Sequence, residues 1–534
     1  MNPEPLDALD AAFLAAETPT MPLHVVAVAV LQPGHGGCGA AQVRDVLADR
    51  IGGMPRLRRR VLRVPFGADH PLWVDVPDLD LDRHLVRASL PPPGGPPELA
   101  AFLGDLAARP LDPDQPLWQL TVVEGLESGH VALVAKVHHC LFDGVSGIAA
   151  FAGLFDATPR GARTGAQGGE AGAPSDAAER GAATSAGPAS AGDGSSPAEA
   201  SLTGLAASVA RRWSRRPVAV ADTVASTYLA LRQLVAEHRG AAAAASGSVP
   251  GAHGEPSPPG PPSPGDAGTA PAGPPAPQPG PLPFRVPRAP WNGTISAARR
   301  CALVAFPLED LLAVRAALGG TVNDVLLAAV GGALRPLLEV PDGGRAAGLA
   351  AMVPVSVRPA GPAGERHGNR VTATMMPIGT DVDGPAERLA AVAAASAAAK
   401  RRAGLVGEEV VRGWSELAVP ALLSRLTRVA ANLRVFDRLP PAANVMVSNV
   451  AGPAAALYLG DARVVALFPF GPVADGIGLN VSALSYGGTM HVGLIACRDR
   501  LPDLDGVATG LRDAVTDLVK QAAAPRRSGA SRQP

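Results

Sequence analysis

Two long stretches rich in Gly, Pro, Ala and Ser interrupt this chain, and they limit its possible folds more than any other feature. They run from about residue 158 to 201 and from about 240 to 282. Such a composition buries too little apolar surface to offset the conformational entropy lost on ordering. The sequence therefore predicts an N-terminal half over 1–158, a partly disordered linker over 159–285, a C-terminal half over 286–522 and a disordered tail over 523–534.

One segment of the linker has helical periodicity. Apolar residues recur at spacings of three and four within 202–238, as in Val224, Tyr228, Leu231 and Val235. This spacing predicts an amphipathic helix that docks on the folded halves.

Both halves show the patterns of a mixed α/β protein. Residues 24–31 and 479–484 predict strands, and the second of these leads into a hairpin at Gly487–Gly488. Residues 321–338 predict a helix that Thr321 caps and that is buried on several sides, because apolar residues fill most of its later positions. The expected fold class is α/β (α+β), with sheet and helices in each half.

The sequence HHCLFDG, residues 138–144, follows the apolar run 131–135, which reads as a strand. Successive strand side chains point to opposite faces, so His138 and His139 cannot both face the same cavity. A histidine near its ordinary pKa can take a proton from a hydroxyl and return it. One histidine is thus the expected base and the other its support, while Asp143 and Gly144 turn the chain.

Cys140 offers a competing Cys-His nucleophile. A thiolate would need an electropositive site and a base within hydrogen-bond reach. Alternation turns Cys140 away from His139, which favours a small buried thiol instead.

The pattern HHxxxDG resembles the motif of the bacterial wax ester synthase/diacylglycerol acyltransferases. Further ordered matches cover both halves of the chain, which makes the resemblance far more specific than one motif would. They are LDAAFL (9–14), ETPTMPLH (17–24), PLWQ (116–119), ND (323–324), PVSVR (354–358), GNR (368–370), SNVAGP (448–453) and LSYGG (484–488).

The resemblance implies a fold and an activity. Related acyltransferases, including chloramphenicol acetyltransferase and condensation domains, build each half as a sheet with helices against it, around a central tunnel. The expected reaction joins an acyl group from acyl-CoA to diacylglycerol or a long-chain alcohol, giving triacylglycerol or wax ester. Acyl-CoA is then a co-substrate, and neither a cofactor nor a metal is expected.

Site roles follow from the same resemblance. The family's second histidine, here His139, is the expected base, and His138, Asp143 and Gly144 are expected to hold its loop. An activated thioester needs only one base and an oxyanion site, so no covalent acyl-enzyme is required.

Two polar pairs are candidate substrate contacts. Asn323 and Asp324 match the family's ND motif, but polar residues also stabilise a helix N-terminus. Ser448 and Asn449 could line the tunnel, but a turn between strands would explain them equally well.

The chain departs from the family pattern at two positions. Gln119 replaces a glutamate, and Cys497 stands where an aspartate is expected. Any charge interaction that those acids make is therefore missing, which could alter activity or substrate choice.

Charge and composition limit the partners. Lys+Arg number 47 against 48 Asp+Glu, whereas nucleic-acid binding usually needs a basic excess. No apolar run is long enough to span a membrane, and the acidic N-terminus does not read as a signal peptide. We therefore expect no nucleic acid as partner and a cytoplasmic protein, in possible peripheral contact with a membrane or lipid droplet.

Two basic runs are relevant to these partners. Arg56–Arg60 could meet CoA phosphates or form a solvated helix face. Arg211–Arg216, with Trp213 among the arginines, could lie on an anionic membrane or simply end the linker helix in water.

Three classes of function remain open. They are a lipid O-acyltransferase, a condensation-type acyltransferase with another acceptor, and a non-catalytic lipid-binding relative. The intact histidine motif disfavours the third class, while the departures at Gln119 and Cys497 keep it open.

Overall fold

The computed structural model describes most of the two halves. The predicted linker helix over 202–238, the run Arg211–Arg216 and nearly all of the predicted tail lie outside the described residues. The described ranges are 3–34, 37–64, 69–142, 144–159, 285–338, 346–356, 371–402 and 420–524.

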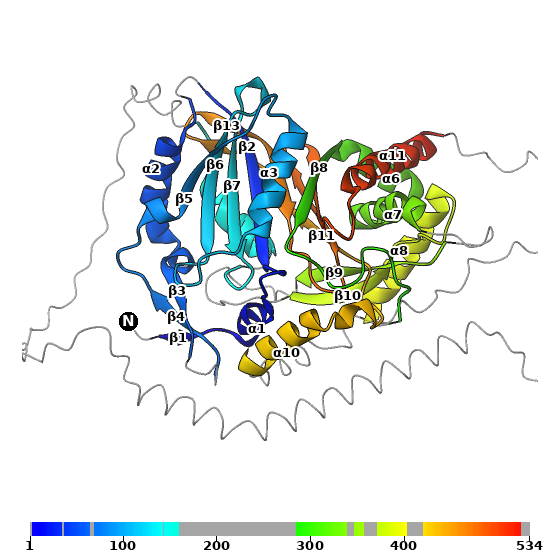
Figure 1. The fold of residues 1–534 in the computed structure, drawn as a ribbon. Coiled ribbons are helices and arrows are strands. Elements are labelled where there is room, and N and C mark those ends of the chain that lie inside the picture. The colour runs from blue at the N-terminus through cyan, green and yellow to red at the C-terminus, as the bar shows by residue number, and fades with distance from the viewer. Residues whose placement is uncertain are drawn as a thin grey trace, which may run out of the picture.

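A six-stranded sheet forms the centre of the N-terminal half, in the order β12-β13-β2-β7-β6-β5. Figure 1 shows its central strands running side by side. The bounds are β2 His24–Gln32, β5 Leu85–Ser89, β6 Trp118–Glu124, β7 Val131–His138, β12 Tyr458–Leu459 and β13 Ala462–Phe470.

Two strands of this sheet come from the C-terminal part of the sequence. β13 pairs antiparallel with β2 over most of its length, from Arg463 opposite Gln32 to Phe470 opposite Val26. β12 extends the sheet beyond β13. The halves are therefore joined by backbone hydrogen bonds, and the sequence boundaries between them remain a prediction.

A second six-stranded sheet belongs to the C-terminal half, in the order β10-β9-β11-β14-β15-β8. Its strands are β8 Arg299–Pro307, β9 Ala350–Ser356, β10 Val371–Pro377, β11 Val445–Ala451, β14 Leu479–Tyr486 and β15 Thr489–Cys497. A small sheet near the N-terminus has the order β1-β4-β3, with β1 Glu4–Pro5, β3 Arg59–Leu62 and β4 Leu72–Asp75.

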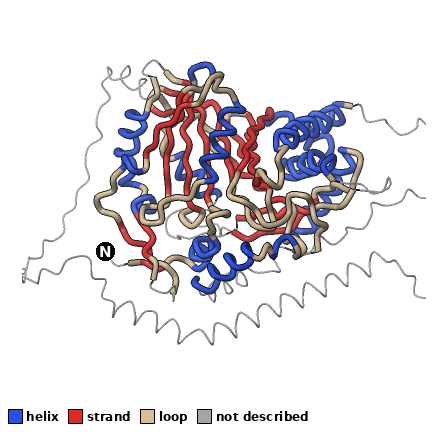
Figure 2. The backbone as a smooth tube through the Cα atoms, viewed as in Figure 1, coloured by secondary structure: helices blue, strands red, loops and turns tan. Residues whose placement is uncertain are grey.

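Helices cover the two large sheets (Figure 2). α6, α7, α8 and α11 pack together on the C-terminal half, and α3 lies against β8. The bounds are α1 Ala8–Ala16, α2 Ala40–Arg50, α3 Pro96–Ala108, α4 Gly144–Ala152, α6 Leu308–Leu318, α7 Val322–Leu334, α8 Pro385–Arg402, α10 Pro420–Asn432 and α11 Leu504–Ala523. The predicted α/β class, with sheet and helices in both halves, is confirmed.

Several local predictions are also confirmed. The segments 24–31 and 479–484 form most of β2 and β14, and β14 and β15 pair as a hairpin. Gly487 and Gly488 both have positive φ, 57° and 78°, as a tight hairpin turn requires. Thr321 caps α7 through its hydroxyl, which accepts a bond from the Asp324 N–H.

Lys136 is a buried cation on β7, two residues before His138 and therefore on the same face of the strand. Its Nζ donates to the carbonyl oxygens of Leu106 and Arg109 at the end of α3, at 3.3 and 3.1 Å. Among the described residues no carboxylate pairs with it. Burial, with a smaller contribution from Arg109, lowers its pKa to about 8.

Gln119 is the cross-strand neighbour of Lys136 in the β6–β7 pair. Its amide donates to Thr121 Oγ1 at 3.0 Å. Directly opposite residues of an antiparallel pair share a face, so a glutamate at 119 would lie beside the Lys136 amine. With Gln119 in place of the expected glutamate, the buried ammonium bonds only carbonyl oxygens within the described ranges.

This arrangement predicts a pH dependence of stability. Because the folded pKa of Lys136 is below the ordinary 10.5, the unfolded chain binds more protons between about pH 8 and 10.5. The free energy of unfolding should rise across that window by about 2–3 kcal/mol relative to Lys136→Met. Urea unfolding of both proteins from pH 7 to 10 measures the difference.

Gln119→Glu is the matched variant for this prediction. A carboxylate beside the amine should raise the pKa of Lys136 and flatten the alkaline increase in stability. Parallel pH profiles for the wild type and Lys136→Met would contradict the account.

Candidate active site

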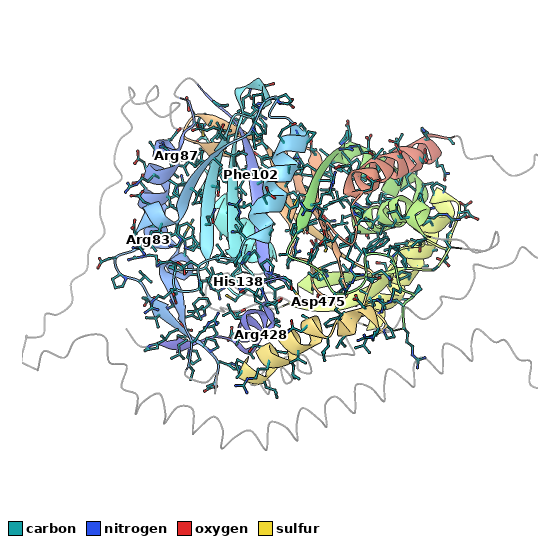
Figure 3. The ribbon with its side chains drawn as sticks, viewed as in Figure 1. Arg83, Arg87, Phe102, His138, Arg428 and Asp475 are labelled. Atoms are coloured by element: carbon teal, nitrogen blue, oxygen red, sulfur yellow. The ribbon has the colours of Figure 1, made fainter. Side chains whose placement is uncertain are left out.

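The HHCLFDG motif begins at the last residue of β7. His138 ends this strand, and His24, the first residue of β2, is its cross-strand partner. Their ring centroids lie 5.7 Å apart at an interplanar angle of 72°. Figure 3 shows His138 at the strand ends above α1 and α10. Both rings are buried, and His138 is only 1% exposed.

Glu17 connects these two histidines. Its Oε1 lies 3.3 Å from His24 Nε2, and its Oε2 lies 3.5 Å from His138 Nε2. Burial alone would raise the Glu17 pKa, but the contacts with the two rings hold that pKa well below its usual range. Burial lowers the pKa of His24 to about 4, so an ionised carboxylate faces a neutral His24 at pH 7.

The tautomer of His138 follows from its second nitrogen. The Cys140 N–H donates to His138 Nδ1 at 3.1 Å. A neutral ring that accepts at Nδ1 carries its proton on Nε2, the atom that faces the Glu17 carboxylate. Both nitrogens of His138 are therefore engaged inside the protein, and the ring suits a supporting role.

His139 lies on the other side of the chain and is only half-buried. Its ring stacks on Phe13 of α1, with centroids 4.3 Å apart and planes 24° from parallel. Its backbone N–H donates to the Leu23 carbonyl at 2.9 Å. The segment that carries Glu17 and His24 therefore also fixes the backbone of His139.

The rest of the motif is held by its neighbours. Arg56 donates to the Leu141 carbonyl, and its guanidinium lies 5.8 Å from the centre of the Phe142 ring. A Cβ on Gly144 would lie 3.9 Å from Val450, which places the start of α4 beside β11. Asp143 lies outside the described residues, so its expected role in the loop remains a prediction.

Two arginines of the basic run 56–60 make contacts within the fold. Besides the contacts of Arg56, Arg59 pairs with Glu4 and Asp75 at 2.8 and 2.9 Å. These contacts favour a structural role for both arginines over phosphate binding.

Ser448 and Asn449 lie within strand β11, so the alternative of a turn between strands is wrong. The parallel register pairs them with Ser482 and Ala483 of β14. Ser448 Oγ donates to Ser482 Oγ at 2.9 Å, and Ser482 in turn bonds Asn480. β11 also carries Val450, so the structure brings this motif and Gly144 together, whereas a substrate contact stays a prediction.

Asn323 and Asp324 occupy the first turn of α7. Asp324 Oδ2 accepts from both the N–H and the hydroxyl of Thr321 at 2.8 Å, which closes a capping box. The helix-capping alternative therefore accounts for Asp324. A substrate contact of either residue remains a prediction.

Cys497 ends β15, and its side chain is fully buried. Its Sγ accepts from the Ser296 N–H at 3.4 Å, and Arg299 bonds the Ser296 carbonyl. Burial lowers the pKa of Arg299, which donates to the carbonyl oxygen of Thr20 at 2.7 Å. Cys497, which replaces the expected aspartate, is the cross-strand neighbour of Arg299, and the hydrogen bonds of this buried cation go to carbonyl oxygens.

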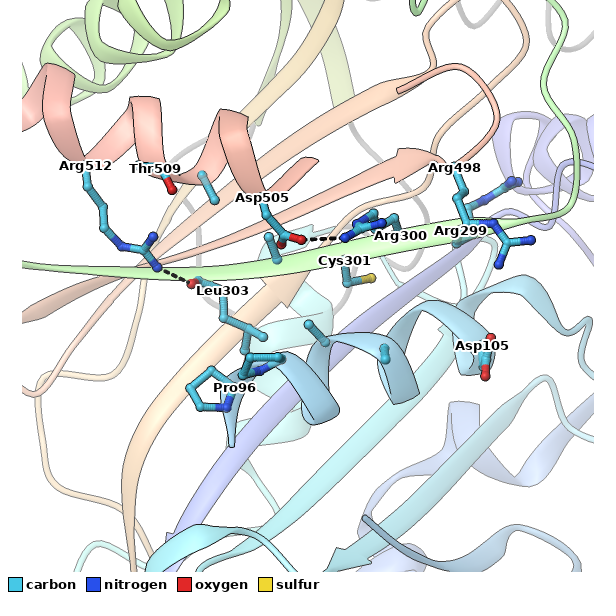
Figure 4. Close-up of a pocket in the computed structure, with 15 residues that line it drawn as sticks. Pro96, Asp105, Arg299, Arg300, Cys301, Leu303, Arg498, Asp505, Thr509 and Arg512 are labelled. Carbon is cyan, nitrogen blue, oxygen red and sulfur yellow. Dashed lines mark hydrogen bonds and ion pairs between the residues drawn. The ribbon is translucent and has the colours of Figure 1, made fainter. Parts of the chain in front are cut away.

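A cavity of about 640 Å³ adjoins Arg299, between α3, β8 and α11 (Figure 4). Four arginines and two aspartates line it: Arg299, Arg300, Arg498, Arg512, Asp105 and Asp505. Arg300 pairs with Asp505 at 2.5 Å. Through the bond from Arg299 to Thr20, the cavity wall contacts the segment that carries Glu17.

The structure does not favour a cysteine nucleophile or a metal site. Burial raises the pKa of Cys140 well above its ordinary value, so the thiol is a poor nucleophile. Within the described ranges, no group of His, Cys, Asp and Glu is arranged to hold a metal ion.

The same ranges contain no single helix that could cross a membrane. A pair formed by Leu308–Leu318 and Val322–Leu337, bent by 97°, meets the length and composition criteria. The second helix of that pair, α7, is part of the buried core.

Glu17 is the functional candidate that the sequence reasoning missed. It is the first residue of the ETPTMPLH match, and His24 is the last. A signal was thus present, but the contact with His138 joins residues more than a hundred positions apart.

Family models match both halves of the chain. The model of the wax ester synthase/diacylglycerol acyltransferase catalytic domain matches residues 6–253 and 266–326. The model of the WS/DGAT C-terminal domain matches residues 367–518. Together they extend over most of the chain.

Curated relatives extend over nearly the full length. A Mycobacterium tuberculosis protein, provisionally named as a diacylglycerol O-acyltransferase, is 31% identical over 522 residues, which are 97% of this chain and 90% of that protein. A Mycobacterium bovis protein with the same type of name is 33% identical over 508 residues, covering 94% of this chain and 88% of that protein.

Solved structures share the fold. A wax ester synthase/diacylglycerol acyltransferase from Marinobacter aquaeolei VT8 has a TM-score of 0.59 at 24% identity, covering 98% of this chain and all of that one. The first condensation domain of the calcium-dependent antibiotic synthetase has a TM-score of 0.52 at 16% identity, covering 98% and 97% of the two chains.

Proposed function

Because this chain belongs to the wax ester synthase/diacylglycerol acyltransferase family, we propose that it transfers the acyl group of acyl-CoA to diacylglycerol, a long-chain alcohol, or both. The products are then triacylglycerol or wax ester, with CoA released. This proposal rests on the different surroundings of the two motif histidines. His138 is buried with both nitrogens engaged, whereas His139 is half-buried at the end of the strand.

His139 acts as the base in this proposal. The acceptor oxygen attacks the thioester carbonyl while His139 takes the hydroxyl proton. The tetrahedral intermediate collapses, and the CoA sulfur leaves with the proton that His139 returns. The reaction needs no covalent acyl-enzyme, in keeping with a Cys140 thiol whose pKa is raised.

His138, Glu17 and Gly144 serve as supporting residues. The contact from Glu17 fixes the His138 ring, and the bond from Cys140 to that ring fixes the backbone next to His139. α4 begins at Gly144, so its first N–H groups are candidates to stabilise the developing oxyanion.

The expected result is ester formation from palmitoyl-CoA by the purified protein, offered diacylglycerol and hexadecanol separately. Thin-layer chromatography of a labelled acyl chain measures triacylglycerol and wax ester, and a thiol reagent measures the released CoA. Equal amounts of ester and CoA support the transferase, and the faster acceptor identifies its preferred substrate.

A protein that binds palmitoyl-CoA but esterifies neither acceptor would contradict the proposal. It would favour the non-catalytic lipid-binding relative. Transfer to an amine in preference to both hydroxyl acceptors would favour the condensation-type alternative.

A further inference from the structure

Helix α10, Pro420–Asn432, has an unusual surface. Most surface helices bury their large apolar side chains and expose the polar ones. On α10 most of the large apolar residues point outward, and none of its residues is fully buried. Three of its residues, with one just beyond its end, are half or more exposed: Leu422 55%, Leu426 57%, Val429 52% and Leu433 60%.

These four side chains form one continuous stripe. Their spacings of four, three and four residues place them within an arc of about 60° on a helix that turns about 100° per residue. The inner side carries Leu423, which is half-buried, and otherwise small or polar side chains, among them Ser424, Thr427 and Ala430. Packing against the protein therefore does not explain the four exposed side chains.

Basic residues border the stripe, and the helix contains no acidic residue. Arg425 and Arg428 are exposed and lie on one side of it. Arg434 and Arg438 follow shortly after the helix, where Arg434 pairs with Asp437 at 2.6 Å, and Leu439 is 49% exposed. An apolar stripe bordered by arginines complements a lipid surface, where the leucines enter the acyl region and the guanidinium groups meet phosphates.

The position of α10 relates this surface to the candidate active site. α10 packs against α1. α1 carries Phe13, on which His139 stacks. Figures 1 and 3 show α10 beneath α1, on the side where the strand ends carry the motif. A lipid surface on α10 would thus lie next to the helix on which the proposed base stacks.

We propose that the apolar stripe of α10, with Arg425 and Arg428 beside it, is the surface by which this protein docks on an anionic phospholipid layer. This inference deepens the proposed function, since diacylglycerol and long-chain alcohols reside in such layers. The stripe differs from the predicted membrane contact at Arg211–Arg216, which lies outside the described residues.

Vesicle flotation tests the proposal without any substrate. The full-length protein is mixed with vesicles of phosphatidylcholine alone or with added phosphatidylglycerol. The wild type should float with the anionic vesicles, and Leu426→Glu/Val429→Glu should lower the partition coefficient at least about 10-fold. Arg425→Gln/Arg428→Gln should lower it about 5-fold per arginine on anionic vesicles only.

Leu312→Glu is the matched control. Leu312 is an exposed leucine, 42% accessible, on α6 in the C-terminal half. Its substitution adds one of the two negative charges of the double variant to a different helix and should leave flotation unchanged. Activity of the α10 variants toward octanoyl-CoA and a short water-soluble alcohol should also stay at the wild-type level, which shows that the fold is intact.

Several results would overturn the proposal. Flotation of the glutamate double variant at the wild-type level, or failure of the wild type to float, excludes the stripe as a lipid-docking surface. A wild-type dimer that this variant dissociates would show that a second copy covers the stripe. A lower melting temperature without any vesicle effect would show that another segment of the chain covers it. Absence of esterification with intact flotation would overturn the proposed function alone.

Discussion

His139→Ala is expected to lower kcat for acyl transfer by about 10²- to 10⁴-fold, the range that a positioned general base contributes. The KM for acyl-CoA should change little, because the proton transfer belongs to the transition state. His139 is half-buried and stacks on Phe13, so the folded structure should persist with a modest loss of stability. Steady-state ester formation and urea unfolding measure the two effects.

His138→Ala provides the contrast. His138 is buried, and its two nitrogens contact Glu17 and the Cys140 N–H. Its removal should lower both stability and activity, since the half-buried Glu17 carboxylate loses one of its partners. If the two alanine variants lost the same activity and the same stability, the division into a base and a support would be wrong.

Glu17→Gln is expected to lower kcat by about 10- to 100-fold. An amide can accept through its oxygen but presents a donor at its nitrogen, so it cannot accept from His24 and His138 together. One ring then faces an amide donor, and the Nε2 atoms of His24 and His138 no longer share a carboxylate. The expected loss corresponds to a charge-assisted hydrogen bond worth about 1.5–3 kcal/mol.

Glu17→Asp is the conservative control, because it keeps the charge and shortens the side chain by one methylene. Partial rescue of kcat by this variant, with an unchanged KM, supports a positioning role. ¹⁵N spectra of the histidines provide an independent readout, since the Nε2–H signal of His138 should change more in the glutamine variant than in the aspartate variant. Wild-type kcat in Glu17→Gln would remove Glu17 from the account.

Local patterns in the sequence predicted local structure well. Segments rich in apolar residues located β2 and β14, two glycines located the hairpin turn, and Thr321 located the cap of α7. These features depend on neighbours a few residues apart. The separation of His138 from His139 followed from strand geometry in the same way.

Long-range contacts were beyond sequence reasoning. Nothing local shows that β13 joins the N-terminal sheet beside β2, because that pairing links residues more than four hundred positions apart. The placement of Glu17 between two histidines depends on the same folding. A turn remained an alternative for Ser448 and Asn449 because short polar sequences fit a turn as well as a strand, and only the pairing with β14 decides between them.

The contacts at Gln119 and Cys497, the two departures from the expected family pattern, were also beyond sequence reasoning. The resemblance predicts that the family's acids are missing at Gln119 and Cys497, but not which groups they would contact. The structure places Lys136 opposite Gln119, and Arg299 bonded to the same serine as Cys497. The pH profile of unfolding predicted for Lys136 tests one of these contacts directly.

The central claim is that His139 promotes direct attack of the acceptor on acyl-CoA. Rapid mixing of the protein with palmitoyl-CoA, first without and then with acceptor, tests it most directly. We predict no burst of CoA without acceptor and no acylated protein in the intact mass, followed by equal release of CoA and ester once acceptor is added. A stoichiometric CoA burst without acceptor, with the acyl group retained on the protein, would contradict the claim.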